Sequence, residues 1–365
     1  MNQSYKYITI IGVGLIGGSL GLAIKRRVKG VVVTGCDKPD VLRKARTRGA
    51  IDIAGKSIAA AVKNADLVIL ACPTANILSL LPAVARYASA ETLVTDVGSV
   101  KSAIVTVANK LFPWGNFIGG HPMAGVELSG IEAAHPLLFE NAVYVLTPLK
   151  HTRRTHVKTL SDFLHTLGAR VLKMDARTHD TVAAAVSHVP QLTAVALMNV
   201  AGLRHKQARK HLQLAAGGFR DLTRIATSRY DVWSDILRFN RAEIARALVL
   251  MTRELNSYGS MLKHSARPAL RNNFATARKL RNAIPRNMKG FLRSLSDLYV
   301  YVQDKPGVLA TMTVALAKAN INIKDMELLK IREGSGGTFR LSFDSPEVSK
   351  KAAKILRKKG FEVEG

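Results

Sequence analysis

The sequence predicts an α/β protein with three parts: an N-terminal doubly wound parallel sheet, an all-helical second domain and a C-terminal ferredoxin-like βαββαβ domain. Short apolar, β-branched runs alternate with helical stretches in the first part, and a glycine-rich turn follows the first run. Long Ala- and Leu-rich helical patterns then replace the strands, and strands return near the C-terminus. We expect domains over 1–173, 174–287 and 296–365, with a linker over 288–295.

Composition indicates a globular protein in a reducing compartment. The chain has 365 residues, of which 47% are hydrophobic, enough for a sizeable core. Its two cysteines, Cys36 and Cys72, lie in apolar runs and fit neither a disulfide framework nor a metal-ligand spacing. No segment reaches about 18 uninterrupted apolar residues, and the glycines of the N-terminal apolar run argue against a secretory signal. We therefore expect a cytoplasmic protein that binds neither a metal nor a membrane.

The net charge of +28 is spread over much of the chain. It is densest over residues 255–296, where no acidic residue occurs. No zinc-finger spacing or aromatic-basic run accompanies the charge, so we expect no specific nucleic-acid partner. A solvated surface that attracts anionic small molecules is the favoured interpretation, and adventitious nucleic-acid binding stays open.

The first predicted strand, Tyr7–Ile11, leads directly into the glycine-rich sequence GVGLIGGS. Gly12, Gly14 and Gly17 form GxGxxG between a strand and a helix, the context in which this motif predicts dinucleotide binding. The three glycines would allow a tight turn, close approach of the pyrophosphate and close helix–strand packing, respectively. This part is therefore of the Rossmann type, with Leu15 and Ile16 completing the cofactor-binding turn.

The second predicted strand ends at Asp37. A carboxylate here can accept hydrogen bonds from the adenosine ribose and repels a 2′-phosphate, so NAD is favoured over NADP, although Lys38 beside it softens the preference. Further strands are expected over 66–72, 92–98 and 142–148. Ligands of such sheets lie at the carboxyl ends of the strands. The candidate site residues placed at these ends are Pro73, Thr74, Ser99 and His121.

His121 lies in GGHPMAGVELSG, residues 119–130, which we expect to be too broken for a regular helix or strand. A lone histidine is more often structural than catalytic. A neutral imidazole, with an ordinary pKa of about 6.5, is nevertheless a competent general base. The position of His121 in sequence, beside the predicted nicotinamide site, favours the catalytic interpretation.

The helical domain carries two polar segments. Pro190 is expected to kink its first long helix one turn beyond His188. Residues 217–237 then gather charged and aromatic side chains around a glycine pair: Arg220, Asp221, Arg224, Arg229 and Trp233. An ordinary solvated helix face is one interpretation. The other is a carboxylate site, for which the planar arginine fork is well suited.

Five motifs resemble the prephenate/arogenate dehydrogenase family in order and spacing: GVGLIGGS, TDVGSVK, GGHPMAGVELSG, SHVP and GFRDLTRIATS, over about residues 5–290. The resemblance implies oxidative decarboxylation of a cyclohexadienyl substrate with a nicotinamide cofactor, a step of tyrosine biosynthesis. We expect an NAD-dependent prephenate dehydrogenase. The resemblance also implies a homodimer formed through the helical domain.

The resemblance assigns site roles residue by residue. His121 accepts a hydrogen bond from the C4 hydroxyl, and Ser99 helps to orient it. Arg224 binds a substrate carboxylate. The remaining pocket residues are implied to be His188 as lining, Glu127 and Asp221 as a polar network, and Trp233 as a wall. Many relatives carry a second histidine where this chain has Gln191, which leaves the choice between prephenate and arogenate open.

Three alternatives compete with the interpretation as a prephenate dehydrogenase. A β-hydroxyacid-type dehydrogenase shares the order of domains but lacks the HPMAG and TRIA motifs. A non-catalytic regulator that keeps cofactor binding as a relic would be expected to have lost His121 or Arg224. A fused chorismate mutase is not expected, because only about six residues precede the first predicted strand and the C-terminal unit has the wrong pattern.

The C-terminal segment contains DKPGVLA followed by NINIKD and resembles the ACT domain, an amino-acid-sensing module. By this resemblance the ligand lies near the loop Asp304–Gly307, with Asn320 and Asn322 nearby. Feedback by tyrosine is the functional expectation. A dimerising or stabilising module is the alternative.

Overall fold

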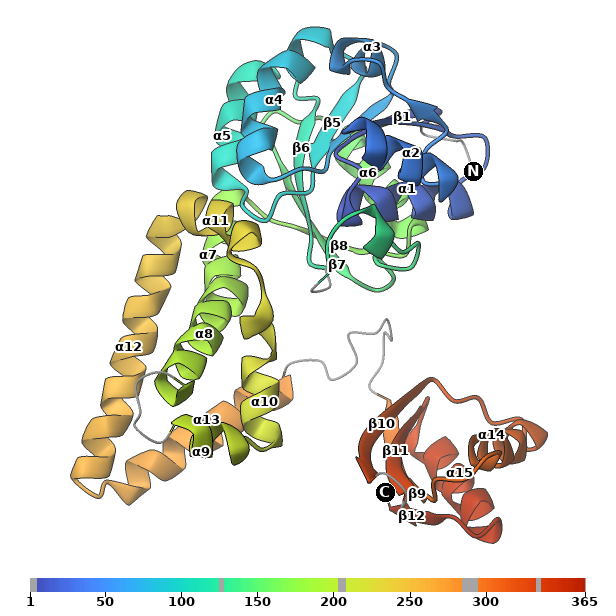
Figure 1. Cartoon of the computed structure of the whole chain (residues 1–365), viewed down its shortest axis with the longest axis vertical. Helices are drawn as coiled ribbons and strands as arrows, with labels where there is room; N and C mark the ends of the chain where they lie inside the picture. Colours follow the sequence, from blue (N-terminus) through green and yellow to red (C-terminus); the bar gives the residue numbers. More distant parts are fainter. Residues whose placement is uncertain (1–4, 125–127, 203–207, 284–294, 333–335, 365) are drawn as a thin grey trace. The chain divides into compact units, whose positions relative to one another are not determined.

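The structure is a computed structural model that describes residues 5–124, 128–202, 208–283, 295–332 and 336–364. The chain divides into two compact units, Met1–Leu270 and Arg271–Gly365 (Figure 1). Each unit is built on a sheet of its own, and each is described separately below.

The first unit contains an eight-stranded sheet in the order β3-β2-β1-β4-β5-β6-β7-β8. Neighbouring strands are parallel except β6 and β7, which are antiparallel. The strands are β1 Tyr7–Ile11, β2 Val32–Cys36, β3 Ile53–Ala54, β4 Leu67–Leu70, β5 Leu93–Asp96, β6 Phe117–Pro122, β7 Val143–Pro148 and β8 Arg170–Lys173. The predicted doubly wound sheet is confirmed, and β3, β6 and β8 are strands that the sequence analysis did not predict.

Helices cover both faces of this sheet, as a doubly wound fold requires. One core contains buried side chains of α1 Leu15–Arg27, α2 Pro39–Thr47 and α6 Arg154–Thr166. The other contains those of α3 Ile58–Lys63, α4 Thr74–Tyr87 and α5 Ser102–Leu111. A short 3-10 helix, η1 Ile131–Ala133, adds Ile131 to the first core.

The remainder of the first unit is helical, which confirms the predicted all-helical second part. Its elements are α7 Ala176–Ala183, the π-helical turn η2 Ala184–His188, α8 Val189–Gly202, α9 Ala208–Gln213, α10 Gly217–Thr223, the 3-10 helix η3 Arg224–Thr227, α11 Tyr230–Phe239 and α12 Arg241–Lys263. Helix α13 Arg267–Ala283 crosses the boundary between the two units. Two carboxylates join this region to the sheet region: Asp235 accepts from the N–H of Ala75 in α4, and Asp180 from two N–H groups at the start of α5.

The kink expected at Pro190 takes the form of the wider turn η2, which ends at His188. Pro190 has no N–H to donate to the preceding turn, so the regular α-helical ladder is interrupted there. Turns of this kind are frequent at functional sites. The turn places His188 in the interior, with 1% of its surface exposed.

The continuous helix Ala176–Gly202 is long and apolar enough to cross a membrane by length and composition, with a mean hydropathy of 1.4 over its most apolar window. The sequence analysis did not identify it, because charged and polar residues interrupt its apolar run. A core helix passes the same test, and this one carries the buried polar side chains His179, Asp180 and His188.

The second unit contains a four-stranded antiparallel sheet in the order β10-β11-β9-β12. Its elements are β9 Ser296–Val302, α14 Val308–Lys318, β10 Asp325–Arg332, β11 Gly336–Phe343, α15 Pro346–Lys358 and β12 Glu362–Glu364. Their order is βαββαβ, as predicted. Alternate residues of β9, Leu298, Val300 and Val302, are buried in a core of its own with Leu316 and Leu356 from the two helices.

Candidate functional site

The glycine-rich turn after β1 is shaped by close contacts that only glycine allows. Gly12 has φ +93°, and a Cβ there would lie 2.5 Å from the carbonyl oxygen of Ala71. A Cβ at Gly17 would lie 1.9 Å from the carbonyl oxygen of Gly12. At Gly14, by contrast, a Cβ would meet nothing within 4 Å. Gly12 and Gly17 therefore serve the turn and the packing of α1, while Gly14 borders open space.

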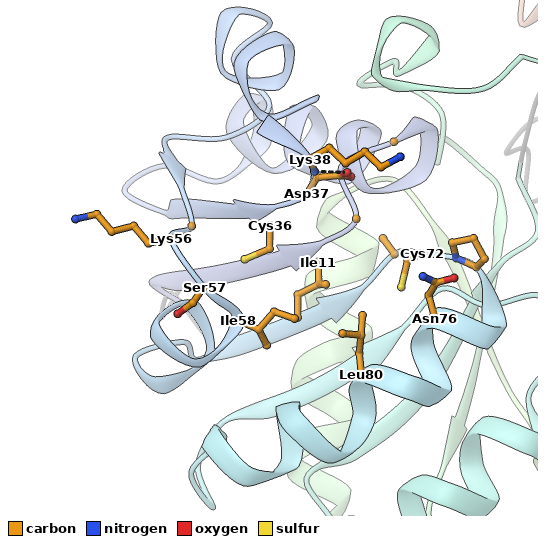
Figure 2. A pocket seen from close by; sticks show the side chains of 15 residues that line it. Ile11, Cys36, Asp37, Lys38, Lys56, Ser57, Ile58, Cys72, Asn76 and Leu80 are labelled. Atoms are coloured by element: carbon orange, nitrogen blue, oxygen red, sulfur yellow. Dashed lines mark hydrogen bonds between the residues drawn. The ribbon is translucent and has the colours of Figure 1, made fainter. Parts of the chain in front are cut away.

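That open space is a cavity of about 600 Å³ at the carboxyl ends of β1, β2 and β4 (Figure 2). Gly12, Gly14, Asp37 and Pro73 line it, as the sequence analysis proposed for the cofactor. Lys38, which the sequence analysis named as softening the preference for NAD, lines it as well. The lining residues that sequence reasoning did not assign to the cofactor are Ile11, Cys36, Gly55, Lys56, Ser57, Ile58, Ala71, Cys72, Asn76 and Leu80. The other predicted cofactor residues, Leu15, Ile16, Gly17 and Thr74, are not among them.

The cavity suits a dinucleotide. Helix α1 starts after Gly14 with no side-chain cap and no acidic residue in its first turn, so its first N–H groups can hold a phosphate. At the far side the carboxylate of Asp37 is fixed by two backbone donors, the N–H groups of Val13 and Lys38, each at 2.7 Å. Figure 2 shows Asp37 and Lys38 together at the rim. The chain thus offers a phosphate site and a ribose acceptor on one cavity.

Both cysteines border this cavity. Burial, and next the nearby carboxylate of Asp37, raises the pKa of Cys36 to about 11. Burial, and next the carboxylate of Asp96, raises the pKa of Cys72 to about 12. Both thiols are therefore protonated near neutral pH and act as apolar walls.

His121 lies inside strand β6, Phe117–Pro122, so the prediction that its segment forms no strand is wrong for residues 119–122. The antiparallel pairing of His121 with Val145 of β7 holds the two glycines and the proline in extended backbone. The side chain is 9% exposed. Its Nδ1 lies 2.8 Å from Nε2 of His179, with the two rings edge to face.

His179 and Asp180 are site residues that sequence reasoning missed. Nδ1 of His179 lies 2.8 Å from Oδ1 of Asp180, and each residue is 2% exposed. Asp180 accepts hydrogen bonds from the N–H groups of Lys101 and Ser102, both at 2.8 Å. The only signal in the sequence was a polar His-Asp pair at the start of a long apolar helix.

Lys101 and Asp96, the last residue of β5, form a fully buried ion pair. Asp96 also accepts from the N–H groups of Gly98, at 2.8 Å, and Gly120, at 3.1 Å. The Lys101 ammonium donates to the carbonyl of Gly120 at 2.6 Å. These bonds fix the residues directly before Ser99 and His121 to one another.

His188 completes a second cluster in the helical region. Nδ2 of Asn240 donates to the backbone carbonyl of Asp180 at 2.9 Å and lies 3.1 Å from Nδ1 of His188. The ring of Trp233 meets the His188 ring edge to face, with centroids 5.9 Å apart. Gln191, the departure noted in the sequence, is buried and donates to the carbonyl of Ile225 at 3.0 Å. Gln191 thus anchors the turn η3 that carries Arg224.

The other predicted site residues are placed as follows. Ser99 is half-buried just beyond the end of β5, next to the strand that carries His121. Asp221 on α10 and Arg224 at the start of η3 are exposed. Glu127 lies outside the described residues. Among the described residues, no group of three or more His, Cys, Asp or Glu side chains is arranged to hold a metal.

Burial favours the neutral form of two histidines of the site, His121 and His188. Burial, and next the charges of His179 and Lys101, moves the pKa of His121 well below its usual range. Burial lowers the pKa of His188 to about 4. For Asp180 burial acts in the opposite direction, but hydrogen bonds from His179, Ser102 and Lys101 outweigh it and lower the pKa. Burial therefore favours the neutral imidazoles of His121 and His188, beside an ionised Asp180.

Comparison with known proteins identifies the family. Residues 20–173 match the prephenate dehydrogenase nucleotide-binding domain, residues 175–276 the prephenate dehydrogenase dimerization domain, and residues 296–361 the ACT domain. The prephenate dehydrogenase of Bacillus subtilis (strain 168) is 36% identical over 359 residues, covering 98% of this chain and 97% of the relative. The chain belongs to the prephenate dehydrogenase family.

Solved structures of the family agree. The prephenate dehydrogenase of Aquifex aeolicus, in complex with hydroxyphenyl propionate and NAD+, is 30% identical, with a TM-score of 0.73 over 78% of this chain and 100% of that one. The arogenate dehydrogenase of Synechocystis is also 30% identical, with a TM-score of 0.68 over 76% of this chain and 99% of that one. The family predicted from the motifs is confirmed, and with it the prediction of an NAD-dependent dehydrogenase.

The ACT domain has a cavity of its own, of about 370 Å³. It is lined by the loop between β9 and α14, including Asp304 and Gly307, and by Leu328 and Phe339 of the sheet. Asn320 and Asn322, also predicted as effector residues, follow the other end of α14 and do not line it. Gly307 has φ +82°, which favours glycine at this turn.

Proposed function

We propose that this chain is an NAD-dependent prephenate dehydrogenase that converts prephenate to 4-hydroxyphenylpyruvate with loss of CO₂. The observation that carries the proposal is a buried, neutral His121 in the strand next to β5, in the same sheet whose carboxyl edge holds the cofactor cavity. The relative solved with NAD+ and hydroxyphenyl propionate, an aromatic ring with a carboxylate side chain, supports it.

The reaction needs a base at one position of the substrate ring. Bound NAD would supply the acceptor for the hydride at C4, and the C4 hydroxyl must lose its proton as it becomes a carbonyl. In the proposed mechanism His121 accepts that proton, Ser99 orients the hydroxyl and Arg224 holds a carboxylate. General-base assistance of this kind is worth about 10²- to 10⁴-fold. Loss of CO₂ makes the ring aromatic, which drives the step forward.

We further assign the pocket around the ring to His188 and Trp233, whose rings meet edge to face. Asp221 and Glu127 are assigned to a polar network that controls access. Arogenate is the alternative substrate, because Gln191 stands where many relatives have histidine. Gln191 acts on the same turn as Arg224 through its bond to Ile225, which makes it the residue to examine if arogenate is preferred.

Assembly and regulation follow from the domains. We propose a cytoplasmic homodimer formed through the helical region, where large apolar side chains are exposed, among them Leu214, Leu222 and Val232. Exposed apolar surface marks an interface where it is contiguous. The charged surface is proposed to bind no specific nucleic acid. We also propose tyrosine as the effector, bound at the ACT cavity beside Asp304.

Absorbance of reduced nicotinamide tests the function directly. Purified protein is mixed with prephenate or arogenate, each with NAD or NADP. Fast reduction is expected with prephenate and NAD. Turnover with arogenate alone would replace the proposed substrate. No reduction in any mixture, with NAD binding intact by calorimetry, would instead favour a non-catalytic regulator.

A further inference from the structure

We propose that His179 and Asp180 form a positioning relay that holds His121 in the tautomer with its proton on Nδ1 and its lone pair on Nε2. The inference deepens the proposed function, since it explains how a buried histidine is held ready to accept a proton. It rests on a series of hydrogen bonds that runs from the start of α5 through Asp180 and His179 to His121 in β6. At each step the known acceptor determines which atom of the pair must be the donor.

The chain begins at Asp180, whose role can only be that of an acceptor. Its Oδ1 receives the N–H of Lys101 and its Oδ2 the N–H of Ser102, each at 2.8 Å, so the carboxylate caps the N-terminus of α5. That position favours negative charge. An ionised carboxylate has no proton to give. The contact of 2.8 Å to His179 therefore requires that Nδ1 of His179 donates.

The second step determines which ring nitrogen of His121 carries the proton. A neutral His179 that carries its proton on Nδ1 has a lone pair on Nε2. Nδ1 of His121 lies 2.8 Å from that atom, so it must be the donor. The proton of neutral His121 is thereby placed on Nδ1, and Nε2 is left as the base. In the opposite arrangement His121 would carry its proton on Nε2 and could not accept another there.

The charged and titratable groups that face the pair are Lys101, His188 and Asp180, and a doubly protonated His179 is the state that would reverse the direction of the hydrogen bonds. Lys101 before α5 is cationic, and its ammonium is paired with Asp96 of β5. His188 of η2 is a further titratable group near both rings, and its pKa of about 4 keeps it neutral. Asp180 of α7 provides the only carboxylate in direct contact with His179 within the described residues.

His188 is expected to adopt the opposite tautomer, so it serves as an internal reference for the other two histidines. Nδ2 of Asn240 donates to a backbone carbonyl, so the atom that faces Nδ1 of His188 is an amide nitrogen. Nδ1 of His188 is then the acceptor, and its proton lies on Nε2. Three buried histidines are expected in two tautomers, with His121 and His179 in one and His188 in the other.

Nitrogen-15 NMR of the full chain labelled in the histidine rings reads these tautomers without any turnover. Resonances are assigned by their loss in the single variants His121→Asn, His179→Gln and His188→Asn. Near pH 7.5 we expect a protonated Nδ1 and an unprotonated Nε2 for His121 and His179, and the reverse for His188. A proton on Nε2 of His121, or a doubly protonated His179, overturns the proposal.

Kinetics test whether the relay matters for turnover. His179→Phe removes both hydrogen bonds at similar volume, whereas His179→Gln keeps a polar group that can accept from His121. We expect His179→Phe to lower kcat about 10- to 100-fold, the size of loss seen when a partner that orients a metal-bound histidine is removed. KM should change less than about 2-fold. Gln should recover part of the loss.

Asn116→Leu is the matched control, because Asn116 is a fully buried polar residue at the other end of β6, bonded to Ser89 and Thr92. It should lower the melting temperature and leave kcat of the folded enzyme unchanged. An equal loss of kcat in His179→Phe and His179→Gln overturns the relay. A lower melting temperature with unchanged kcat in these two variants overturns it as well. Predicted tautomers in a protein that does not oxidise prephenate would uphold the relay and reject the proposed function.

Discussion

At the scale of single residues, the chemistry proposed for His121 depends on its surroundings. The imidazole is enclosed by β6, β7 and α7, and burial disfavours its protonated form more than any other influence. A base must be unprotonated to act. The same burial that shields the ring from water therefore keeps it in its working form.

The pH dependence of kcat should show this. A general base loses activity as the pH falls through its pKa in the enzyme–substrate complex. The pKa of His121 is lowered by burial, so we expect the acid limb of kcat to lie below about pH 6.5, the ordinary histidine value. Measured kcat over about pH 5 to 9 checks this. An acid limb above neutrality would mean that another group is the base.

His121 and Arg224 should differ in the constant they change. His121→Asn keeps a polar group of similar size but removes the base, so kcat should fall about 10²- to 10⁴-fold with little change in KM. Arg224→Gln removes a charge that anchors a carboxylate and should chiefly raise KM. Steady-state kinetics of the two variants separates the roles. The reverse pattern would contradict the assignment.

At the scale of elements, the turn from β1 into α1 shows two different needs for glycine. Gly17 is packed against the backbone of Gly12, and Gly14 faces the cofactor cavity. One glycine therefore supports the fold and the other leaves room for a ligand.

Two alanine variants separate these needs. In Gly17→Ala the new Cβ meets backbone, and overpacking should lower the free energy of unfolding by about 1–3 kcal/mol. Gly14→Ala has space in the free protein and should stay within about 0.5 kcal/mol of the wild type. It should still weaken NAD binding about tenfold, because the methyl group occupies the path of the pyrophosphate. Urea unfolding and calorimetry measure the two effects. Equal stability losses would contradict this division.

Local patterns predicted much of this architecture. Strand β1, its glycine turn and the carboxylate of Asp37 follow one another in sequence, so their spacing alone indicated a cofactor site. Strand β6 was missed because its glycines and proline have low strand propensity, and pairing with β7 overrides it. His179 and Asp180 were missed because they meet His121 only when α7 packs against the start of α5.

At the scale of the whole molecule, the proposed function assigns chemistry to the first unit and sensing to the second. The ACT domain has its own sheet, helices and hydrophobic core, so it does not need the first unit to fold. Its cavity lies within the unit and is separate from the cofactor cavity. The division of the first unit at residue 173 remains a prediction.

Removing residues 296–365 should therefore spare catalysis and abolish regulation. We expect the truncated chain to retain kcat within about 3-fold, since the catalytic contacts described above lie before Leu270. Tyrosine should inhibit the full chain and no longer affect the truncated one. Inhibition that persists unchanged would place the tyrosine site in the first unit.

The central claim is that this chain oxidises and decarboxylates prephenate with His121 as base. Its most direct test is to measure NADH and CO₂ together after adding prephenate and NAD to the wild type and to His121→Asn. We expect one CO₂ for each NADH in the wild type and a reaction at least about 100-fold slower in the variant. NADH without CO₂, or equal rates in the two proteins, would contradict it.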